Sequence, residues 1–135
     1  MPKTSIIGAS EKLDKSYPAF ILATTAAVSR WKAKLFFTFW CLLALKRGYE
    51  PTQISVGCRE YSGILTEALS SGAILNWRTI ITQAKTTGKL KVYACSTIYD
   101  PFGLNEKTLE NLDSIVGAAY FLRKAKDPDI TLFIS

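Results

Sequence analysis

The stretch KVYACSTIYDPFG, residues 91–103, marks the point where a buried strand gives way to a loop. Its first half is an apolar run of the kind found in strands that are buried on both faces. Its second half contains Asp-Pro and Phe-Gly, and proline and glycine interrupt regular structure. Cys95 closes the apolar run. The sequence therefore predicts a strand over residues 90–95 that ends on a thiol.

Other apolar runs alternate with helical patterns along the rest of the 135 residues. The predicted strands cover residues 4–9, 34–39, 90–95, 114–116 and 130–134. The predicted helices cover residues 16–29, 40–47, 61–69, 105–112 and 118–126, with one more between Asn76 and Gly88. This alternation favours an α/β fold with a mostly parallel five-stranded sheet and helices on both faces. A chain of this length is expected to form a single domain, residues 1–135.

Capping residues and prolines set several of the predicted helix ends. Pro18 suits the first turn of a helix, where a missing N–H has no cost. Gly48 is expected to end the helix over residues 40–47. Asn76 and Asn105 are good N-caps. The helix over residues 61–69 lies in a segment broken by prolines and glycines, and either covers a site or contacts another subunit.

Composition excludes several kinds of chemistry. The chain has no histidine, so His-ligated metals, Ser-His-Asp triads and Cys-His dyads are ruled out. The three cysteines, Cys41, Cys58 and Cys95, lack the spacing of a zinc site. The stretch GASEK after the first strand lacks the dinucleotide-binding glycine pattern. We therefore expect neither a metal nor a cofactor.

Charge and hydropathy bear on the partners and the cellular location of the protein. The net charge is +6, but the lysines and arginines are scattered and do not interleave with aromatic residues, so no nucleic-acid partner is expected. The most apolar stretch, residues 35–45, is shorter than the roughly 18 residues of a membrane span. Charged residues interrupt any signal-peptide core near the N-terminus. We expect a reduced, cytoplasmic protein.

Ligands of parallel α/β sheets bind beyond the carboxyl ends of the strands. Four segments meet this rule: residues 10–15, 40–41, 95–103 and 117. Cys95 is the candidate nucleophile, and cations or helix N-termini favour the thiolate. The candidate groups around it are Lys12, Lys15, Ser96, Tyr99 and Asn105, the last of which opens the helix that Cys95 would face. The alternative is that Cys95 is a buried, inert core residue.

Cys41 also follows a predicted strand, which raises the possibility of a redox pair with Cys95. If the first three strands lie in the order 2-1-3, the Cα atoms of the two cysteines would be about 10 Å apart. A disulfide requires about 7 Å or less. The sequence therefore disfavours this pair. Cys58 lies in a less regular segment and is a weak candidate.

Four motifs in register resemble the DsrE/DsrF-like family, in its stand-alone branch. They are KLDKSYPAFILATTAA (residues 12–27), LFFTFWCLLALKRG (35–48), KVYACSTIYDPFGL (91–104) and ITLFIS (130–135). The resemblance extends from about residue 10 to the end of the chain. It implies a DsrE-like, flavodoxin-like sandwich, assembled as a homotrimer or homohexamer.

The resemblance also implies a function. Members of the family are sulfur carriers that hold sulfur on one cysteine, as a persulfide or thiosulfonate, and pass it to partners such as TusA-like proteins. Cys95 occupies the position of that cysteine. Sulfurtransferase chemistry of this kind requires a thiolate but no histidine or metal.

Two features depart from the family pattern. Cys41 stands where related proteins often have glycine, and the cysteine loop reads Ser-Thr-Ile-Tyr where it is often rich in methionine. The leading hypothesis is a cytoplasmic sulfur carrier. The alternative is a non-enzymatic module that binds a small anion or a partner and has an inert Cys95. A third hypothesis is a redox sensor in which Cys41 resolves an oxidised Cys95.

Overall fold

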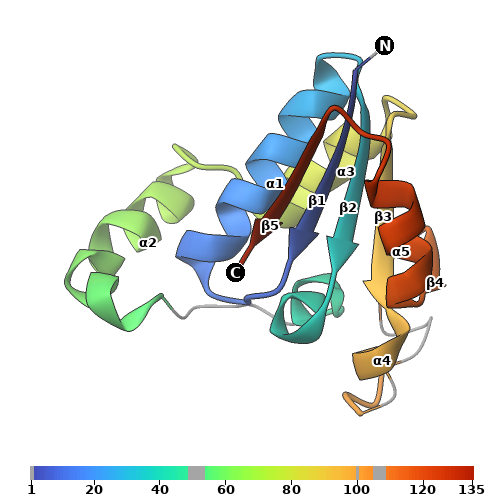
Figure 1. Cartoon of the computed structure of the whole chain (residues 1–135). Helices are drawn as coiled ribbons and strands as arrows, with labels where there is room; N and C mark the ends of the chain where they lie inside the picture. Colours follow the sequence, from blue (N-terminus) through green and yellow to red (C-terminus); the bar gives the residue numbers. More distant parts are fainter. Residues whose placement is uncertain (1, 49–53, 100, 105–108) are drawn as a thin grey trace.

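A five-stranded parallel sheet forms the centre of the protein. The computed structural model describes residues 2–48, 54–99, 101–104 and 109–135, with the backbone alone at Ile98 and Tyr99 (Figure 1). The strands lie in the order β4-β3-β2-β1-β5, and every neighbouring pair is parallel. They are β1 (Lys3–Gly8), β2 (Lys32–Phe37), β3 (Leu90–Cys95), β4 (Ser114–Val116) and β5 (Ile130–Ile134). The predicted α/β class and parallel five-stranded sheet are confirmed.

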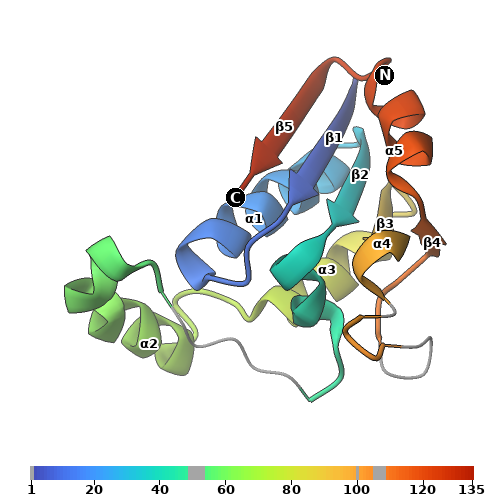
Figure 2. The ribbon, with the colours of Figure 1, turned by 60° about the horizontal axis from the view of Figure 1, so that its bottom comes forward.

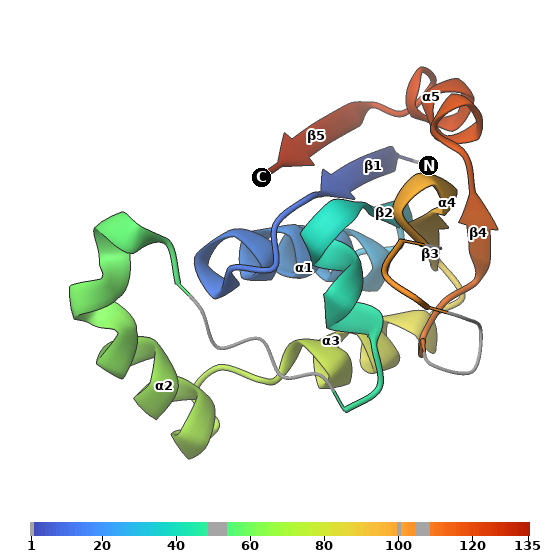
Figure 3. The same cartoon turned by 90° about the horizontal axis from the view of Figure 1, so that it is seen from below.

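Helices cover both faces of the sheet, as predicted. Helices α1 (Leu13–Val28) and α3 (Trp77–Lys85) lie on one face, and α5 (Ala118–Ala125) lies on the other (Figures 1 and 3). Parallel strands require crossover connections, and α5 carries the chain from β4 at one edge to β5 at the other. The shorter elements are the 3₁₀ helices η1 (Phe39–Leu45) and η2 (Val56–Tyr61) and the helices α2 (Ser62–Ser71) and α4 (Ser96–Tyr99).

Side chains of β3 alternate between two separate hydrophobic clusters. Val92 and Ala94 join the cluster that includes α1 and α3. Tyr93 and Cys95 join the cluster beneath α5. This period of two is the ordinary geometry of a strand. It explains the continuous apolar run in the sequence and assigns Cys95 to the α5 face.

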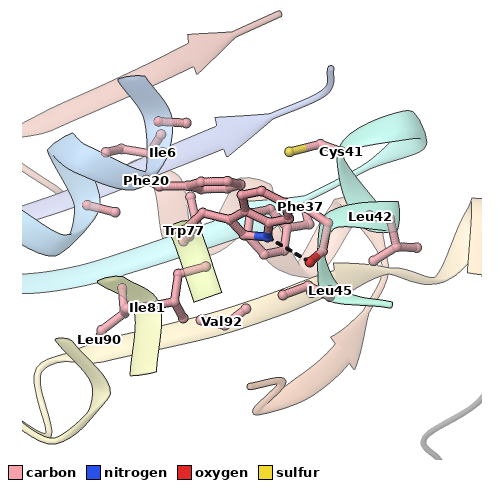
Figure 4. Packing of buried hydrophobic residues seen from close by; sticks show 14 of the residues in the cluster. Ile6, Phe20, Phe37, Cys41, Leu42, Leu45, Trp77, Ile81, Leu90 and Val92 are labelled. Carbon is pink, nitrogen blue, oxygen red and sulfur yellow. Dashed lines mark hydrogen bonds between the residues drawn. The ribbon is translucent and has the colours of Figure 1, made fainter. Parts of the chain in front are cut away.

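The larger cluster fixes η1 against α3 (Figure 4). The indole Nε1 of Trp77 donates a buried hydrogen bond to the Ala44 carbonyl oxygen at 3.1 Å. Phe20 of α1 packs edge-on against Phe37 of β2, with ring centroids 5.4 Å apart. Because the indole reaches a partner, this large side chain is buried without leaving its N–H unsatisfied.

Cys41 fills a space left by a glycine in the neighbouring strand. The thiol is fully buried, and its Sγ lies 3.0 Å from where a Cβ atom on Gly8 would stand. Burial raises the pKa of Cys41 to about 12. A thiol with this pKa stays protonated near neutral pH, so Cys41 acts as a small core residue.

Segment η2–α2 projects from the body of the protein, and none of the residues in η2 or α2 is buried (Figures 2 and 3). The predicted helix over residues 61–69 is confirmed, and Gly72 ends it with a φ of 80°. The Ser55 N–H donates to Asp14 Oδ1 at 2.9 Å. Burial of Asp14 opposes ionisation, but the hydrogen bonds from Ser55 outweigh it and lower the pKa of the carboxyl. Coverage of a site or contact with another subunit stays a prediction.

Several predicted boundaries differ from the structure, among them those of β2, α1 and η1. Strand β2 begins and ends two residues before the predicted range of 34–39. Helix α1 begins at Leu13 because the Lys12 carbonyl accepts from the Ser16 N–H at 2.8 Å, so Pro18 lies in the second turn and not the first. The segment after β2 is a 3₁₀ helix that ends at Leu45, before Gly48, because Lys46 forms a bridge with Leu109.

The predicted helix over residues 105–112 is wrong in its described part, and Asn105 itself lies outside the described residues. Residues 109–112 are not helical. The Glu110 N–H donates to the Leu45 carbonyl at 3.0 Å, and Leu109 bridges Lys46. These long-range backbone contacts take the groups that a helix would use internally.

We expect Gly8→Ala to destabilise the protein by about 1–3 kcal/mol, because the added methyl group would be forced against Cys41 Sγ. In a Cys41→Ala background the same substitution should cost nothing measurable. The measurement is a double-mutant cycle of urea unfolding. Gly63→Ala is the control, since a Cβ there meets nothing within 4 Å. Equal costs of Gly8→Ala in the two backgrounds would contradict the assigned contact.

Candidate functional site

Cys95 lies at the carboxyl end of β3, and α4 begins at the next residue. Its side chain is 4% exposed and belongs to the cluster with Phe36, Tyr93 and Phe121. Phe121 is the fourth residue of α5, so the thiol lies on the face of the sheet that the first turn of α5 covers. The predicted position of Cys95 at a strand end is confirmed.

The amino end of α5 meets the same sheet edge. Cys95 pairs in register with Val116, the last residue of β4, and Gly117 then caps α5 without a side-chain hydrogen bond. Ser96 Oγ lies 3.9 Å from where a Cβ on Gly117 would stand. Helix N-termini present N–H groups and a partial positive charge. Helix α5 therefore takes the place beside Cys95 that the sequence assigned to a helix opened by Asn105.

Asp113 holds β4, and with it the start of α5, against β3. Its Oδ2 accepts from the Val92 N–H at 2.7 Å, and Lys85 Nζ donates to the same oxygen. The Asp113 N–H returns a bond to the Val92 carbonyl at 2.9 Å. Sequence reasoning missed this residue because it lies far along the chain from the strand that it holds.

Tyr93 and Tyr120 are a second group that sequence reasoning missed. Their ring centroids are 6.0 Å apart. Tyr93 precedes Cys95 by two residues in β3, so both side chains lie on the face that α5 covers. Burial raises the pKa of Tyr93, and the neighbouring Tyr120 adds to the effect through its charge and a hydrogen bond. Tyr93 therefore remains a neutral phenol. The alternation in the run KVYAC could have placed it beside Cys95.

The other predicted site residues are spread over the carboxyl edge of the sheet. Ser96 opens α4 and lies near Gly117. Lys12 and Lys15 lie at the start of α1, at the end of a strand two places away from β3 and on the opposite face. Tyr99 closes α4, but its side chain is not described, and Asn105 is outside the described residues. Of this group, Ser96 is near Cys95 because it is the next residue in the chain, and the structure places its side chain near Gly117.

The strand order 2-1-3 assumed for the first three strands is wrong. Strand β3 pairs with β2, so these strands lie in the order β3-β2-β1. The two cysteines nevertheless lie on opposite faces of the sheet. Cys41 belongs to the α1 and α3 cluster and Cys95 to the α5 cluster. All three cysteines are in the described residues, and no disulfide joins them. The sheet itself therefore separates Cys41 from Cys95.

Comparison with known proteins shows what the chain is similar to. Residues 1–63 match the model of the DsrE/DsrF/DrsH-like family. The sulfur carrier protein DsrE2 of Allochromatium vinosum is 27% identical, over 98% of each chain. The chain is thus similar to DsrE/DsrF-like proteins, through the family model over its first 63 residues and through this relative over nearly its whole length. The uncharacterized protein YrkE of Bacillus subtilis is 24% identical, over 98% of this chain and 96% of YrkE.

Solved structures show the same fold. The ychN protein of E. coli matches with a TM-score of 0.68 and 18% identity, over 98% of this chain and 99% of its own. Protein MTH1491 of Methanobacterium thermoautotrophicum, described as of unknown function, matches with a TM-score of 0.62 and 12% identity. The match covers 98% of this chain and 99% of MTH1491. Within the described part of the chain, no cluster of three or more His, Cys, Asp or Glu side chains could hold a metal ion.

We expect the three thiols of the folded protein to react with iodoacetamide in the order of their exposure. Cys58 is exposed and should be alkylated first, while Cys41 is fully buried and should react only on unfolding. Peptide mapping after timed alkylation measures this order, with Cys58→Ser as the control that removes the fast phase. Labelling of Cys95 as fast as Cys58 would contradict the burial of Cys95.

Proposed function

We propose that the protein is a sulfur carrier that holds a sulfur atom on Cys95 and passes it to a protein partner. The observation that carries the proposal is the position of Cys95, at a strand end beside the amino end of α5. The family supports it, since the relative from Allochromatium vinosum is named as a sulfur carrier protein. The absence of histidine is compatible with thiol chemistry that needs no other catalytic group.

Transfer to Cys95 is an exchange between thiols. The Cys95 thiolate attacks the outer sulfur of a donor persulfide, a new S–S bond forms on Cys95, and the donor S–S bond breaks. The donor leaves as a thiolate and takes a proton from water, so the exchange requires no external oxidant or reductant. An acceptor thiolate then removes the outer sulfur in the same way. A thiosulfonate form would place its sulfonate oxygens near the α5 N–H groups, which favour negative charge.

The residues proposed to bind the sulfur species are those at the carboxyl edge. Ser96 lies beside Gly117 and is the candidate closest to Cys95 in the fold. Lys12 and Lys15 lie on the same edge but on the other face, where they fit contact with an acidic partner better than contact with the sulfur itself. Tyr99 and Asn105 remain predicted binding residues.

The proposed partners are a TusA-like carrier and further copies of this chain, in a trimer or hexamer in the cytoplasm. An exposed apolar side chain supports association between copies. Phe133 of β5 pairs with Ile7 of β1, on the face of the sheet that carries α5, and is 64% exposed. Among the described helices, none has the length and apolar character of a membrane span.

The burial of Cys95 favours a second candidate function. A thiol that is 4% exposed in an aromatic cluster is also what an inert core cysteine looks like. In that case the protein would be a binding module without sulfur turnover. The two functions predict opposite results on incubation with polysulfide, since only a carrier takes up sulfur on Cys95.

The Cys41→Ala/Cys58→Ser double variant keeps Cys95 alone and tests both functions. After incubation with polysulfide at neutral pH, the intact mass should increase by one or more sulfur atoms, and reduction should reverse the change. Adding Cys95→Ser should abolish the adduct. If the Cys95-only protein stays unmodified while still folded by circular dichroism, the carrier proposal fails and the binding module is favoured.

Removal of one α5 N–H should slow the reaction of Cys95. Ala118→Pro deletes this donor at the first helical position, where proline is tolerated, and the extended Gly117 before it suits proline. We expect sulfur uptake by the Cys95-only protein to slow by about two- to fivefold, the rate equivalent of a helix-terminus interaction. Ala118→Ser, which keeps the N–H, is the matched control. Equal rates for the two variants would exclude a role for this N–H group.

A further inference from the structure

Four lysines surround a pocket at the end of the sheet opposite to Cys95. The pocket has a volume of about 340 Å³, and Ser5, Asp127 and Pro128 complete most of its lining together with Lys3, Lys32, Lys34 and Lys124. It lies on the α5 face, since Lys34 is two residues before Phe36 in β2. Lys34 pairs in register with Lys91, four residues before Cys95. The pocket is therefore roughly 13 Å from Cys95 along the strands.

The fold brings these lysines together from separate parts of the chain. Lys3 and Lys32 are partners in the β1–β2 register, and Ser5 is the partner of Lys34. Side chains alternate between the two faces along a strand, so Lys3, Ser5, Lys32 and Lys34 all lie on the same face of the sheet. Lys124 comes from the last turn of α5, and the connection from α5 to β5, which includes Asp127, crosses the amino ends of the strands (Figure 1).

The positive charge in the pocket is only partly balanced by the protein. Four lysines and one acidic residue, Asp127, line the pocket. None of the four lysines forms an ion pair within the described part of the chain, although Lys124 Nζ lies 5.6 Å from the centroid of the Tyr120 ring. The nearby carboxylate of Asp129 accepts from the backbone N–H of Lys3 at 2.8 Å and offsets part of the charge. Burial, followed by the charges of Lys124, Lys3 and Lys32, lowers the pKa of Lys34.

Ser5 is a second, independent sign of a ligand. It is fully buried in the wall of the pocket, and its Oγ has no hydrogen-bond partner within the described residues. A buried hydroxyl without a partner costs free energy, and such groups are rare in folded proteins. A negatively charged acceptor in the pocket would satisfy this hydroxyl and the ammonium groups together.

We propose that this pocket binds a small oxyanion with two negative charges, such as sulfate, thiosulfate or inorganic phosphate. The size of the pocket suits one such ion with its bound water, and oxyanions accept several charge-assisted hydrogen bonds at once. The site is separate from the Cys95 edge, because the aromatic layer of Phe36, Tyr93 and Phe121 lies between them. It does not depend on the proposed carrier function.

Calorimetric titration with sulfate and with phosphate, at an ionic strength held constant with chloride, tests the proposal. We expect saturable binding of one anion per chain. Lys34→Gln should weaken it by about tenfold or more, as expected for the loss of a charged hydrogen-bond donor. Lys126→Gln removes the same charge just after α5 but outside the pocket lining, and should change the affinity by less than about twofold.

Two further readouts separate a ligand site from a structural role. In chloride alone, Lys34→Gln should melt at the same temperature as the wild type or higher, because it relieves repulsion, and sulfate should raise the melting temperature of the wild type more. Ser5→Ala should stabilise the free protein but weaken anion binding. Equal losses of affinity in Lys34→Gln and Lys126→Gln, no saturation, or binding of a DNA oligomer but of neither inorganic anion would each overturn the proposal.

Discussion

The stacking of Phe36 on Phe121 fixes the geometry on which both proposed sites depend. The rings are 4.2 Å apart and nearly parallel, at 16°. This contact joins the carboxyl-terminal half of β2 to the first half of α5, so it sets where that helix lies on the sheet. The amino end of α5 is thereby held near Cys95, and its last turn carries Lys124 toward the opposite end. This one aromatic contact thus positions the two ends of α5 at the two proposed sites, the Cys95 edge and the lysine pocket.

The unequal cover of the two faces follows from the strand order. Because the chain builds β1 to β4 in one direction, α1 and α3 share one face, and the single crossover to β5 leaves α5 alone on the other. One helix cannot cover a five-stranded sheet. The uncovered part includes Phe133, and the lysines occupy the part where apolar cover ends. The polar and apolar surfaces that remain are therefore consequences of topology.

The sequence predicted the bounds of those strands whose ends are set by residues nearby in the chain. Strands β3, β4 and β5 have the predicted bounds because turn residues flank their apolar runs. Strand β2 was misplaced because apolar residues continue past Phe37 into η1, and hydrophobicity alone does not separate the two. The predicted helix over residues 105–112 failed over residues 109–112, where the Glu110 N–H donates to the Leu45 carbonyl and Leu109 bridges Lys46. The lysine pocket depends on register between distant segments, which one sequence does not reveal.

The buried position of Cys95 limits the routes by which a sulfur donor could reach it. Phe36, Tyr93 and Phe121 close the approach from the middle of the sheet, and the strand backbone closes the approach from the α1 face. The remaining direction is from the carboxyl edge, where a Cβ on Gly117 would stand 3.9 Å from Ser96 Oγ, an ordinary packing contact. Because Cys95 is only 4% exposed, a donor would reach the thiol from this edge only after side chains there move. A carrier function therefore requires movement at the carboxyl edge, whereas an inert core cysteine requires none.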